Sequence, residues 1–273
     1  MRWRRGGSSP TGRPVSTCDV AAVISTELRL DGKVALITGG TRGIGRAIAE
    51  AYAAAGASVA VLARKPAELE ETQAALETIG GRVLTFAGSA GDPEAIDAVT
   101  RACVDELGRL DVLVNNAATN PAFGPMIETE TRAVDKVLEV NVVGPLLLAQ
   151  AAWRVWMEEH GGTIVNIVSV GGMRPAPFIG IYNVSKAALA HMTRQLALEL
   201  APTVRVNAIA PGLVKTDMAK ALWETGEEAI AARHPMQRLG VPDDIAGLAL
   251  FLASDLSSWM TGNVIPVEGG MSL

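Results

Sequence analysis

Short apolar runs alternate with longer helical segments along most of this chain, and this alternation limits the possible folds more than any other feature. Strands are predicted at 33–38, 58–63, 82–87, 110–116, 162–169, 204–210 and 263–268. Helices are predicted at roughly 43–55, 66–79, 92–107, 130–159, 182–201 and 243–253. Continuously apolar strands separated by helices are typical of a parallel sheet covered on both faces. Because crossovers between parallel strands are right-handed, we expect a doubly wound α/β fold with about seven parallel strands.

A glycine-rich loop follows the first predicted strand. The segment Thr38–Gly45 comes after the apolar run Val34–Ile37 and opens an alanine-rich helix that reaches about Ala55. Backbone N–H groups and the positive end of the helix dipole make such a loop an anion site. Its spacing is not G-x-G-x-x-G, and an ordinary turn is the alternative interpretation. The order strand, loop, helix favours a pyrophosphate site in a single Rossmann-type domain, in which Gly39, Gly43 and Gly45 allow a tight turn and close approach.

A second pattern indicates proton chemistry. Tyr182 lies thirteen residues after Ser169, and Lys186 lies four residues after Tyr182. Residues at i and i+4 share one helical face. A phenol has an unperturbed pKa of about 10, and a neighbouring ammonium favours the phenolate. We therefore expect Lys186 to lower the pKa of Tyr182. Ser169 ends a β-branched strand, where ligands bind in open α/β sheets.

Together these motifs resemble the short-chain dehydrogenase/reductase family, and in particular its 3-oxoacyl-carrier-protein reductase-like branch. The resemblance extends from about Gly32 to the C-terminus. The motifs that carry it, in chain order, are Thr38-Gly39-x-x-x-Gly43-Ile44-Gly45, Asn115-Asn116-Ala117, Asn141, Ser169, Tyr182-x-x-x-Lys186 and Pro211-Gly212. The resemblance implies that Tyr182 donates the proton, that Ser169 hydrogen-bonds the carbonyl oxygen and that Lys186 holds the nicotinamide ribose.

The resemblance also implies a set of cofactor-binding residues and a homotetramer. The cofactor residues are Gly39, Thr41, Arg42, Gly43, Ile44, Gly45, Arg64, Asn116, Ala117, Tyr182, Lys186, Pro211, Gly212, Val214 and Thr216. The tetramer contacts are expected on the helices near 130–159 and 182–201. Two positions depart from the family pattern: Ser89 replaces an Asp at the adenine pocket, and Ala118 replaces a Gly after Asn-Asn-Ala.

Asn141 also has a local argument. It lies within a helical segment, and Pro145 follows four residues later. Proline has no N–H, so the carbonyl of Asn141 loses its helical partner and is free to bind water. The resemblance implies that this water connects the catalytic lysine to solvent; the alternative is a kink without a role.

The end of the second strand bears on the choice of nicotinamide cofactor. An acid at this place holds the ribose 2′-OH of NAD, whereas an arginine accommodates the 2′-phosphate of NADP. The chain has Ala63 where the acid is expected, followed by Arg64, and the glycine loop adds Arg42. These cations favour NADP(H) over NAD(H). The alternative interpretation makes Arg64 and Lys65 solvated surface charges.

The substrate is less constrained. Apolar side chains on loops around the expected site predict a pocket for an apolar body beside the carbonyl, and they are Phe123, Met173, Phe178, Met218 and Trp223. The irregular segment 213–235 follows a strand and is predicted to be a substrate lid. Arg174 is either a contact for an anionic group or solvated.

Composition excludes several classes of protein. With a net charge of −5 the chain has no sign of a nucleic-acid partner. No stretch reaches the ~18 uncharged apolar residues of a membrane span. Cys18 and Cys103 cannot form a disulfide framework, which indicates a reducing, cytoplasmic setting. The three histidines have no metal-ligand spacing, so no metal is expected. Residues 1–27 are basic and rich in Gly, Ser and Pro, and they are predicted to be a flexible tail outside a single domain of 28–273.

These observations predict an NAD(P)-dependent oxidoreductase that acts on a small carbonyl or alcohol, most simply an NADPH-dependent ketone reductase. One alternative is an alcohol, sugar or steroid dehydrogenase working in oxidation. Another is a non-catalytic nucleotide-sensing scaffold, which would not need Ser169, Tyr182 and Lys186 together.

Overall fold

Residues 28–273 are described by the structure, a computed structural model, and the tail predicted at 1–27 lies outside them. Seven parallel strands form one sheet in the order β3-β2-β1-β4-β5-β6-β7. The strands are β1 (Val34–Thr38), β2 (Ser58–Ala63), β3 (Val83–Ala87), β4 (Val112–Asn115), β5 (Gly162–Ile167), β6 (Val204–Pro211) and β7 (Val264–Val267). The predicted doubly wound α/β fold is confirmed.

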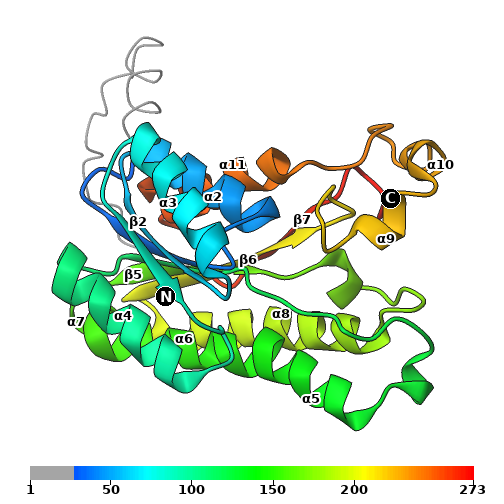
Figure 1. The fold of residues 1–273 in the computed structure, drawn as a ribbon, viewed down its shortest axis with the longest axis horizontal. Helices are drawn as coiled ribbons and strands as arrows, with labels where there is room; N and C mark the ends of the chain where they lie inside the picture. The colour runs from blue at the N-terminus through cyan, green and yellow to red at the C-terminus, as the bar shows by residue number, and fades with distance from the viewer. Residues whose placement is uncertain (1–27) are drawn as a thin grey trace, which may run out of the picture.

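Helices cover both faces of the sheet (Figure 1). One layer contains α2 (Gly43–Ala54), α3 (Pro66–Ile79) and α11 (Pro242–Ala253), and the other contains α4 (Pro93–Leu107), α6 (Gly144–Ala152) and α8 (Gly180–Leu200). Successive residues of a strand point to opposite faces. Ile37 accordingly packs with Ile48 and Ile245 on one side, whereas Leu36 packs with Val99 and Leu148 on the other. Both faces are apolar, which explains why the strands lack polar alternation.

Local signals set several helix boundaries. α3 begins with Pro66 at its first position, where the missing N–H costs nothing. The Asp92 carboxylate caps α4 by accepting from the backbone N–H of Glu94 at 3.1 Å. Gly108 ends the same helix in a left-handed conformation, with φ +86°. These boundaries lie within one residue of those predicted.

The helix predicted at 130–159 is not one regular helix. It consists of α5 (Thr131–Leu138), a π-helical turn Glu139–Val143, α6, a second π-helical turn Trp153–Met157 and α7 (Glu158–His160). The backbone N–H of Gly144 donates to the carbonyl of Glu139, which is an i+5 bond. Pro145 has no N–H to offer the preceding turn, so the ladder widens just before it. The prediction of a helix over 130–159 was therefore wrong at two π-helical turns, and Pro145 is the physical reason for the first of them.

The strand order reverses between β1 and β4, and this is where ligands bind in open α/β sheets. The glycine loop leaves β1 and the Asn116–Ala117 segment leaves β4 at this point. Segment 213–235 follows β6 and contains only two short helices, α9 (Lys220–Trp223) and α10 (Glu227–Ala231), which lie beside the carboxyl ends of the strands (Figure 1). Within 28–273 no helix is long and apolar enough to cross a bilayer.

Candidate active site

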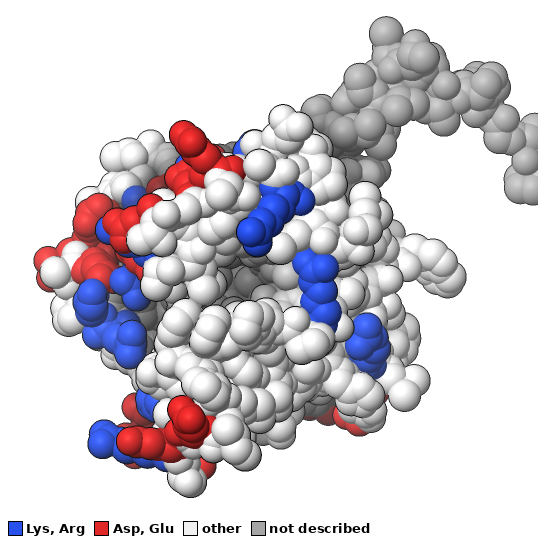
Figure 2. All heavy atoms as spheres, turned by 90° about the vertical axis from the view of Figure 1, so that its right-hand side faces the viewer, with Lys and Arg blue, Asp and Glu red and all other residues white. Residues whose placement is uncertain are grey.

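A cavity of about 580 Å³ opens at the carboxyl ends of the strands. Figure 2 shows this side of the molecule, where mostly uncharged residues surround a central hollow, separate Lys and Arg side chains lie beside it, and acidic and basic side chains cluster along the left margin. The glycine loop, the ends of β2, β4 and β5, the first turns of α8 and the segment after β6 all contribute to its wall. Segments far apart in the sequence therefore meet around one space.

The glycine loop forms the anion-binding end of this cavity. Gly39 and Gly43 have φ +65° and +53°, a conformation that strains residues with a side chain. The helix that follows, α2, has no side-chain cap and no acidic residue in its first turn. Its free N–H groups and dipole are therefore available to a phosphate.

Gly45 does not line the cavity, although it belongs to the predicted loop. A Cβ there would lie 2.3 Å from the carbonyl oxygen of Gly39 and 2.4 Å from Nδ2 of Asn116. Asn116 Nδ2 donates to the carbonyl oxygens of Thr38 at 2.9 Å and Gly39 at 3.1 Å. Gly45 is thus needed for close packing between α2, the loop and the end of β4, rather than for contact with a ligand.

Thr38 completes this link between β1 and β4. Its buried Oγ1 accepts from the backbone N–H groups of Asn116 at 3.1 Å and Ala117 at 3.0 Å. The loops that follow β1 and β4 are therefore tied to each other by partly buried hydrogen bonds, and the sheet supplies a rigid base for the anion site.

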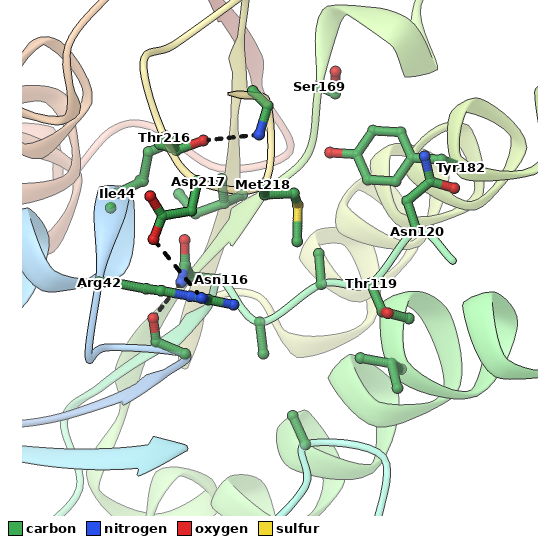
Figure 3. A pocket seen from close by; sticks show the side chains of 18 of the residues that line it. Arg42, Ile44, Asn116, Thr119, Asn120, Ser169, Tyr182, Thr216, Asp217 and Met218 are labelled. Carbon is green, nitrogen blue, oxygen red and sulfur yellow. Dashed lines mark hydrogen bonds and ion pairs between the residues drawn. The ribbon is translucent and has the colours of Figure 1, made fainter. Parts of the chain in front are cut away.

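Ser169, Tyr182 and Lys186 meet on one wall of the cavity. Ser169 follows β5, and its Oγ accepts from the backbone N–H of Gly171 at 3.0 Å. Tyr182 lies in the first turn of α8, and its hydroxyl points into the cavity beside Ser169 (Figure 3). Lys186 lies one turn later, 2% exposed, with Nζ donating to the carbonyl of Ile167 at 2.8 Å and 5.6 Å from the centre of the Tyr182 ring.

Burial dominates the titration of both groups. It raises the pKa of Tyr182 to about 12, and the neighbouring Ser169 hydroxyl counteracts only part of that rise. Burial also lowers the pKa of Lys186 to about 8. The expectation that Lys186 lowers the Tyr182 pKa below its ordinary value was therefore wrong for this structure. Removing both side chains from water disfavours phenolate and ammonium alike, and this cost of burial is the dominant effect on both groups.

Asn141 lies behind the cavity wall and does not line it. It is fully buried in the π-helical turn before α6. Its Oδ1 accepts from the N–H of Thr119 at 2.8 Å, and its Nδ2 donates to the Thr119 carbonyl at 3.0 Å and to Ser185 Oγ at 3.0 Å. Asn141 thus joins the loop after β4 to α8.

The other predicted cofactor residues line the cavity, and Gly45 is the exception. Those on the wall are Gly39, Thr41, Arg42, Gly43, Ile44, Arg64, Asn116, Ala117, Tyr182, Lys186, Pro211, Gly212, Val214 and Thr216. Ser89 and Ala118, the two departures from the family pattern, also line it. Ser89 uses its Oγ to accept from the N–H of Gly91 at 3.2 Å.

Only two of the five predicted substrate residues, Phe123 and Met218, line the cavity. Met173 and Trp223 do not line it, contrary to the prediction: Met173 is 54% exposed, and the Trp223 ring packs under Lys215 Nζ. Phe178 is also outside the wall, but its ring stacks on Phe123 with centroids 5.5 Å apart. Phe178 adopts φ +68°, a strained conformation for a bulky residue.

Several lining residues carried no sequence signal for a site. Glu68 and Asp217 bring carboxylates to the same end as Arg42 and Arg64. Asn120 presents a buried Oδ1 with no partner within the described chain, next to the cavity (Figure 3). Glu68 is in the first turn of a helix, where an acid is expected for the dipole alone. Asn120 is in an irregular loop, and only the fold places it near Tyr182.

A family model described as Enoyl-(Acyl carrier protein) reductase matches residues 39–272. The chain is 40% identical over 244 residues to Dehydrogenase/reductase SDR family member 4 of Sus scrofa, covering 88% of each protein. The chain belongs to the short-chain dehydrogenase/reductase family. This membership makes it an oxidoreductase of the NAD(P)-dependent type, and the predicted resemblance is confirmed.

Solved structures of this family agree with the fold. A short-chain type dehydrogenase/reductase from Mycobacterium marinum superposes with a TM-score of 0.85 at 35% identity, covering 90% of this chain and 98% of that one. L-Sorbose reductase from Gluconobacter frateurii, complexed with NADPH and L-sorbose, has a TM-score of 0.85 at 34% identity with the same coverage, 90% and 98%. Family membership therefore gives the class of reaction, whereas the cofactor preference and the substrate have to be argued from the residues that line the cavity.

The residues present fit a dinucleotide. The uncapped α2 N-terminus and the positive-φ glycines suit its pyrophosphate, and a Cβ at Gly39 would come within 3.1 Å of Ala117 Cα, so the loop has no room for a larger residue. When bound, the nicotinamide supplies or accepts a hydride. No group of three His, Cys, Asp or Glu side chains that could hold a metal occurs in 28–273.

Proposed function

We propose that this enzyme reduces a ketone with an apolar body to a secondary alcohol and uses NADPH for the reaction. One observation carries the proposal: Ser169, Tyr182 and Lys186 share a cavity wall with the glycine loop, so proton donor and nucleotide site face one space. In this arrangement the Tyr182 hydroxyl donates a proton to the carbonyl oxygen, and Ser169 stabilises the charge that develops on that oxygen.

Lys186 has two tasks in this proposal. Its ammonium stabilises the phenolate that remains after Tyr182 has given up its proton, and it holds the ribose of the nicotinamide. Its bond to the carbonyl of Ile167 fixes the direction of the side chain. In alcohol oxidation the same residues act in reverse, with Tyr182 as the base. This is the second direction in which the site can work.

The preference for NADPH rests on the cations at the far end of the cavity. Arg42 and Arg64 line it, and neither Ala63 nor any other residue at the end of β2 supplies a carboxylate. Among residues 28–273, Arg64 has no ion-pair partner and is exposed, so its guanidinium is available to a phosphate. The NADPH bound by L-sorbose reductase is consistent with this assignment.

The test is oxidation of NADPH, followed by its absorbance, with a panel of β-keto esters and other apolar ketones. Turnover by the wild type and its loss by about 10²–10⁴-fold in Tyr182→Phe is expected. A variant that keeps full turnover would exclude Tyr182 as the proton donor. Retention of nucleotide binding by Tyr182→Phe serves as the control for folding.

Two finer features are also proposed. Segment 213–235 closes over the substrate as a lid, since Thr216, Asp217 and Met218 already contribute to the cavity wall.

The second feature is the oligomeric state: the enzyme is a homotetramer. Exposed apolar side chains on α8 support an interface between copies, with Leu198 77% exposed. Light scattering coupled to size-exclusion chromatography measures the oligomeric state directly.

A further inference from the structure

Three cations line the end of the cavity between the glycine loop and β2, and they are Arg42, Arg64 and Lys65. Their partners differ. Arg42 approaches the Asp217 carboxylate at 3.8 Å, Lys65 donates to Glu68 at 2.6 Å, and Arg64 has no ion pair in the part of the chain that the structure describes. Two of the three positive charges at this end are therefore shared with carboxylates.

Glu68 is the more closely held of the two carboxylates. It stands in the first turn of α3, with a side chain 31% exposed. Its Oε1 accepts from Lys65 Nζ at 2.6 Å, and its Oε2 accepts from Thr41 Oγ1 at 3.0 Å. Glu68 thus bridges the end of β2 and the glycine loop, the two segments that carry the cations of the proposed nucleotide site.

The carboxylate stays charged at neutral pH. The hydrogen bond from Lys65, assisted by that from Thr41, holds the pKa of Glu68 below its ordinary range. A helix-dipole role would leave the side chain in solvent near the α3 amides. The bond to Thr41 instead turns it towards the cavity, which it lines.

We propose that Glu68 is a specificity-determining residue that opposes binding of a 2′-phosphate and so limits the preference of this enzyme for NADP(H) over NAD(H). The inference rests on the proposed function, because it concerns the same nucleotide site. A negative charge beside the ribose repels a phosphate and occupies Lys65, the cation that would otherwise meet it. A ribose without a 2′-phosphate has no such charge to repel, and its 2′-OH can donate a hydrogen bond to a carboxylate.

Asp217 has a smaller part in this balance. Its side chain is 75% exposed and its contact with Arg42 is 3.8 Å long, so water screens the charge. It comes from the segment after β6, and its carboxylate faces Arg42 (Figure 3). Two carboxylates at one end of the site therefore contribute unequally.

Binding of two nucleotide fragments that differ only in the 2′-phosphate tests the inference without turnover. Isothermal calorimetry measures the dissociation constants of 5′-AMP and 2′,5′-ADP for the wild type and for Glu68→Gln. The ratio of the AMP constant to the 2′,5′-ADP constant is expected to rise about fivefold in Glu68→Gln, as expected for one partly screened charge. The gain shrinks as salt rises, because the interaction is electrostatic.

Glu70→Gln is the matched control. Glu70 stands on the same helix, is exposed and does not line the cavity, so its loss changes net charge equally while leaving the ratio unchanged. Glu68→Asp keeps the charge and is expected to stay within about twofold of the wild type. Thermal unfolding of each variant shows that the fold is retained.

The outcomes separate this inference from the proposed function. Arg64→Ala is expected to lower the ratio about tenfold through loss of a charge-assisted bond. If Arg64→Ala lowers it while Glu68→Gln leaves it unchanged or lowers it, the Glu68 inference is overturned and the NADPH assignment stands. If neither substitution changes the ratio, the Glu68 inference and the NADPH assignment are both overturned. If the ratio rises in Glu68→Gln and does not change in Arg64→Ala, the Glu68 inference is supported and Arg64 is excluded as a contact of the 2′-phosphate.

Discussion

The two ends of the cavity are built in different ways. The nucleotide end consists of strand ends, glycines and backbone amides, which partly buried hydrogen bonds of Thr38 and Asn116 hold together. The substrate end consists of side chains on loops, and several of them are more than half exposed, among them Phe123 at 63% and Met218 at 51%. The first end tolerates little change, whereas the second allows many side chains. A family can therefore keep one cofactor site while its members act on different substrates.

The largest effect is expected from substitution at the rigid end. In Gly45→Ala the new Cβ would stand 2.3 Å from the Gly39 carbonyl oxygen, so the loop must move. A displacement of about 1 Å lowers turnover by about 10²-fold, and nucleotide affinity should fall with it. Calorimetry and steady-state kinetics measure both quantities.

Gly247→Ala is the control for this comparison. Gly247 lies within α11, and a Cβ there meets nothing within 4 Å. Alanine in a helix interior should leave binding unchanged and raise the free energy of unfolding by about 0.5–1 kcal/mol. Nucleotide affinity of Gly45→Ala within threefold of the wild type would contradict the view that this end is rigid.

The pH dependence of ketone reduction tests the roles of Tyr182 and Lys186, which lie between the two ends of the cavity. Tyr182, with a pKa raised to about 12, stays protonated at pH 6–10, so the donor itself imposes no loss. Lys186, with a pKa lowered to about 8, loses its proton as the pH rises, and the charge that stabilises the phenolate disappears. The value of kcat/KM should fall about tenfold per pH unit above that point. A profile that remains flat to high pH would show that the Lys186 charge is not required.

An intermediate effect is expected from Asn141→Ala, which removes the hydrogen bonds that link the loop after β4 to α8 behind the cavity wall. The substitution leaves the Thr119 backbone groups and Ser185 without their buried partner. The free energy of unfolding should fall by about 1–3 kcal/mol. Turnover should fall by about tenfold because the loop after β4 and α8 lose their link, while nucleotide affinity stays constant. Denaturant unfolding with full wild-type stability would refute the positioning role.

The smallest effect is expected at the exposed end. Phe123→Ala removes an aromatic ring that lines the cavity and stacks on Phe178. The KM for an apolar ketone should rise about threefold with kcat unchanged, since such a contact contributes modest binding alone. Ile127→Ala is the control, because Ile127 is 94% exposed on the same loop and does not line the cavity. A fall in kcat for Phe123→Ala would place this end closer to the chemistry than its exposure indicates.

Most of the fold could be predicted from local patterns. The boundaries of α3 follow from Pro66 and those of α4 from Asp92 and Gly108, which are signals within a few residues. The helix predicted at 130–159 failed at its π-helical turns, even though Pro145 was visible. A proline shows where a ladder is disturbed, but packing against the neighbouring elements decides whether the chain stops, bends or widens.

The residues of the candidate site also divide into those that local sequence patterns located and those that only packing placed. Motif spacing located Ser169, Tyr182 and the glycine loop, yet it placed Met173 and Trp223 in the cavity and gave no hint of Asn120. Those side chains belong to loops, whose direction depends on what they pack against.

The amino-acid sequence by itself determined the strand and helix pattern, the glycine loop and the family, because apolar periodicity and backbone freedom are properties of neighbouring residues. Only the tertiary structure decided which charges meet, as when Glu68 bridges Lys65 and Thr41, and how far burial shifts the pKa values of Tyr182 and Lys186. Desolvation and charge pairing depend on everything that surrounds a group in space, and residues distant in the chain supply those surroundings.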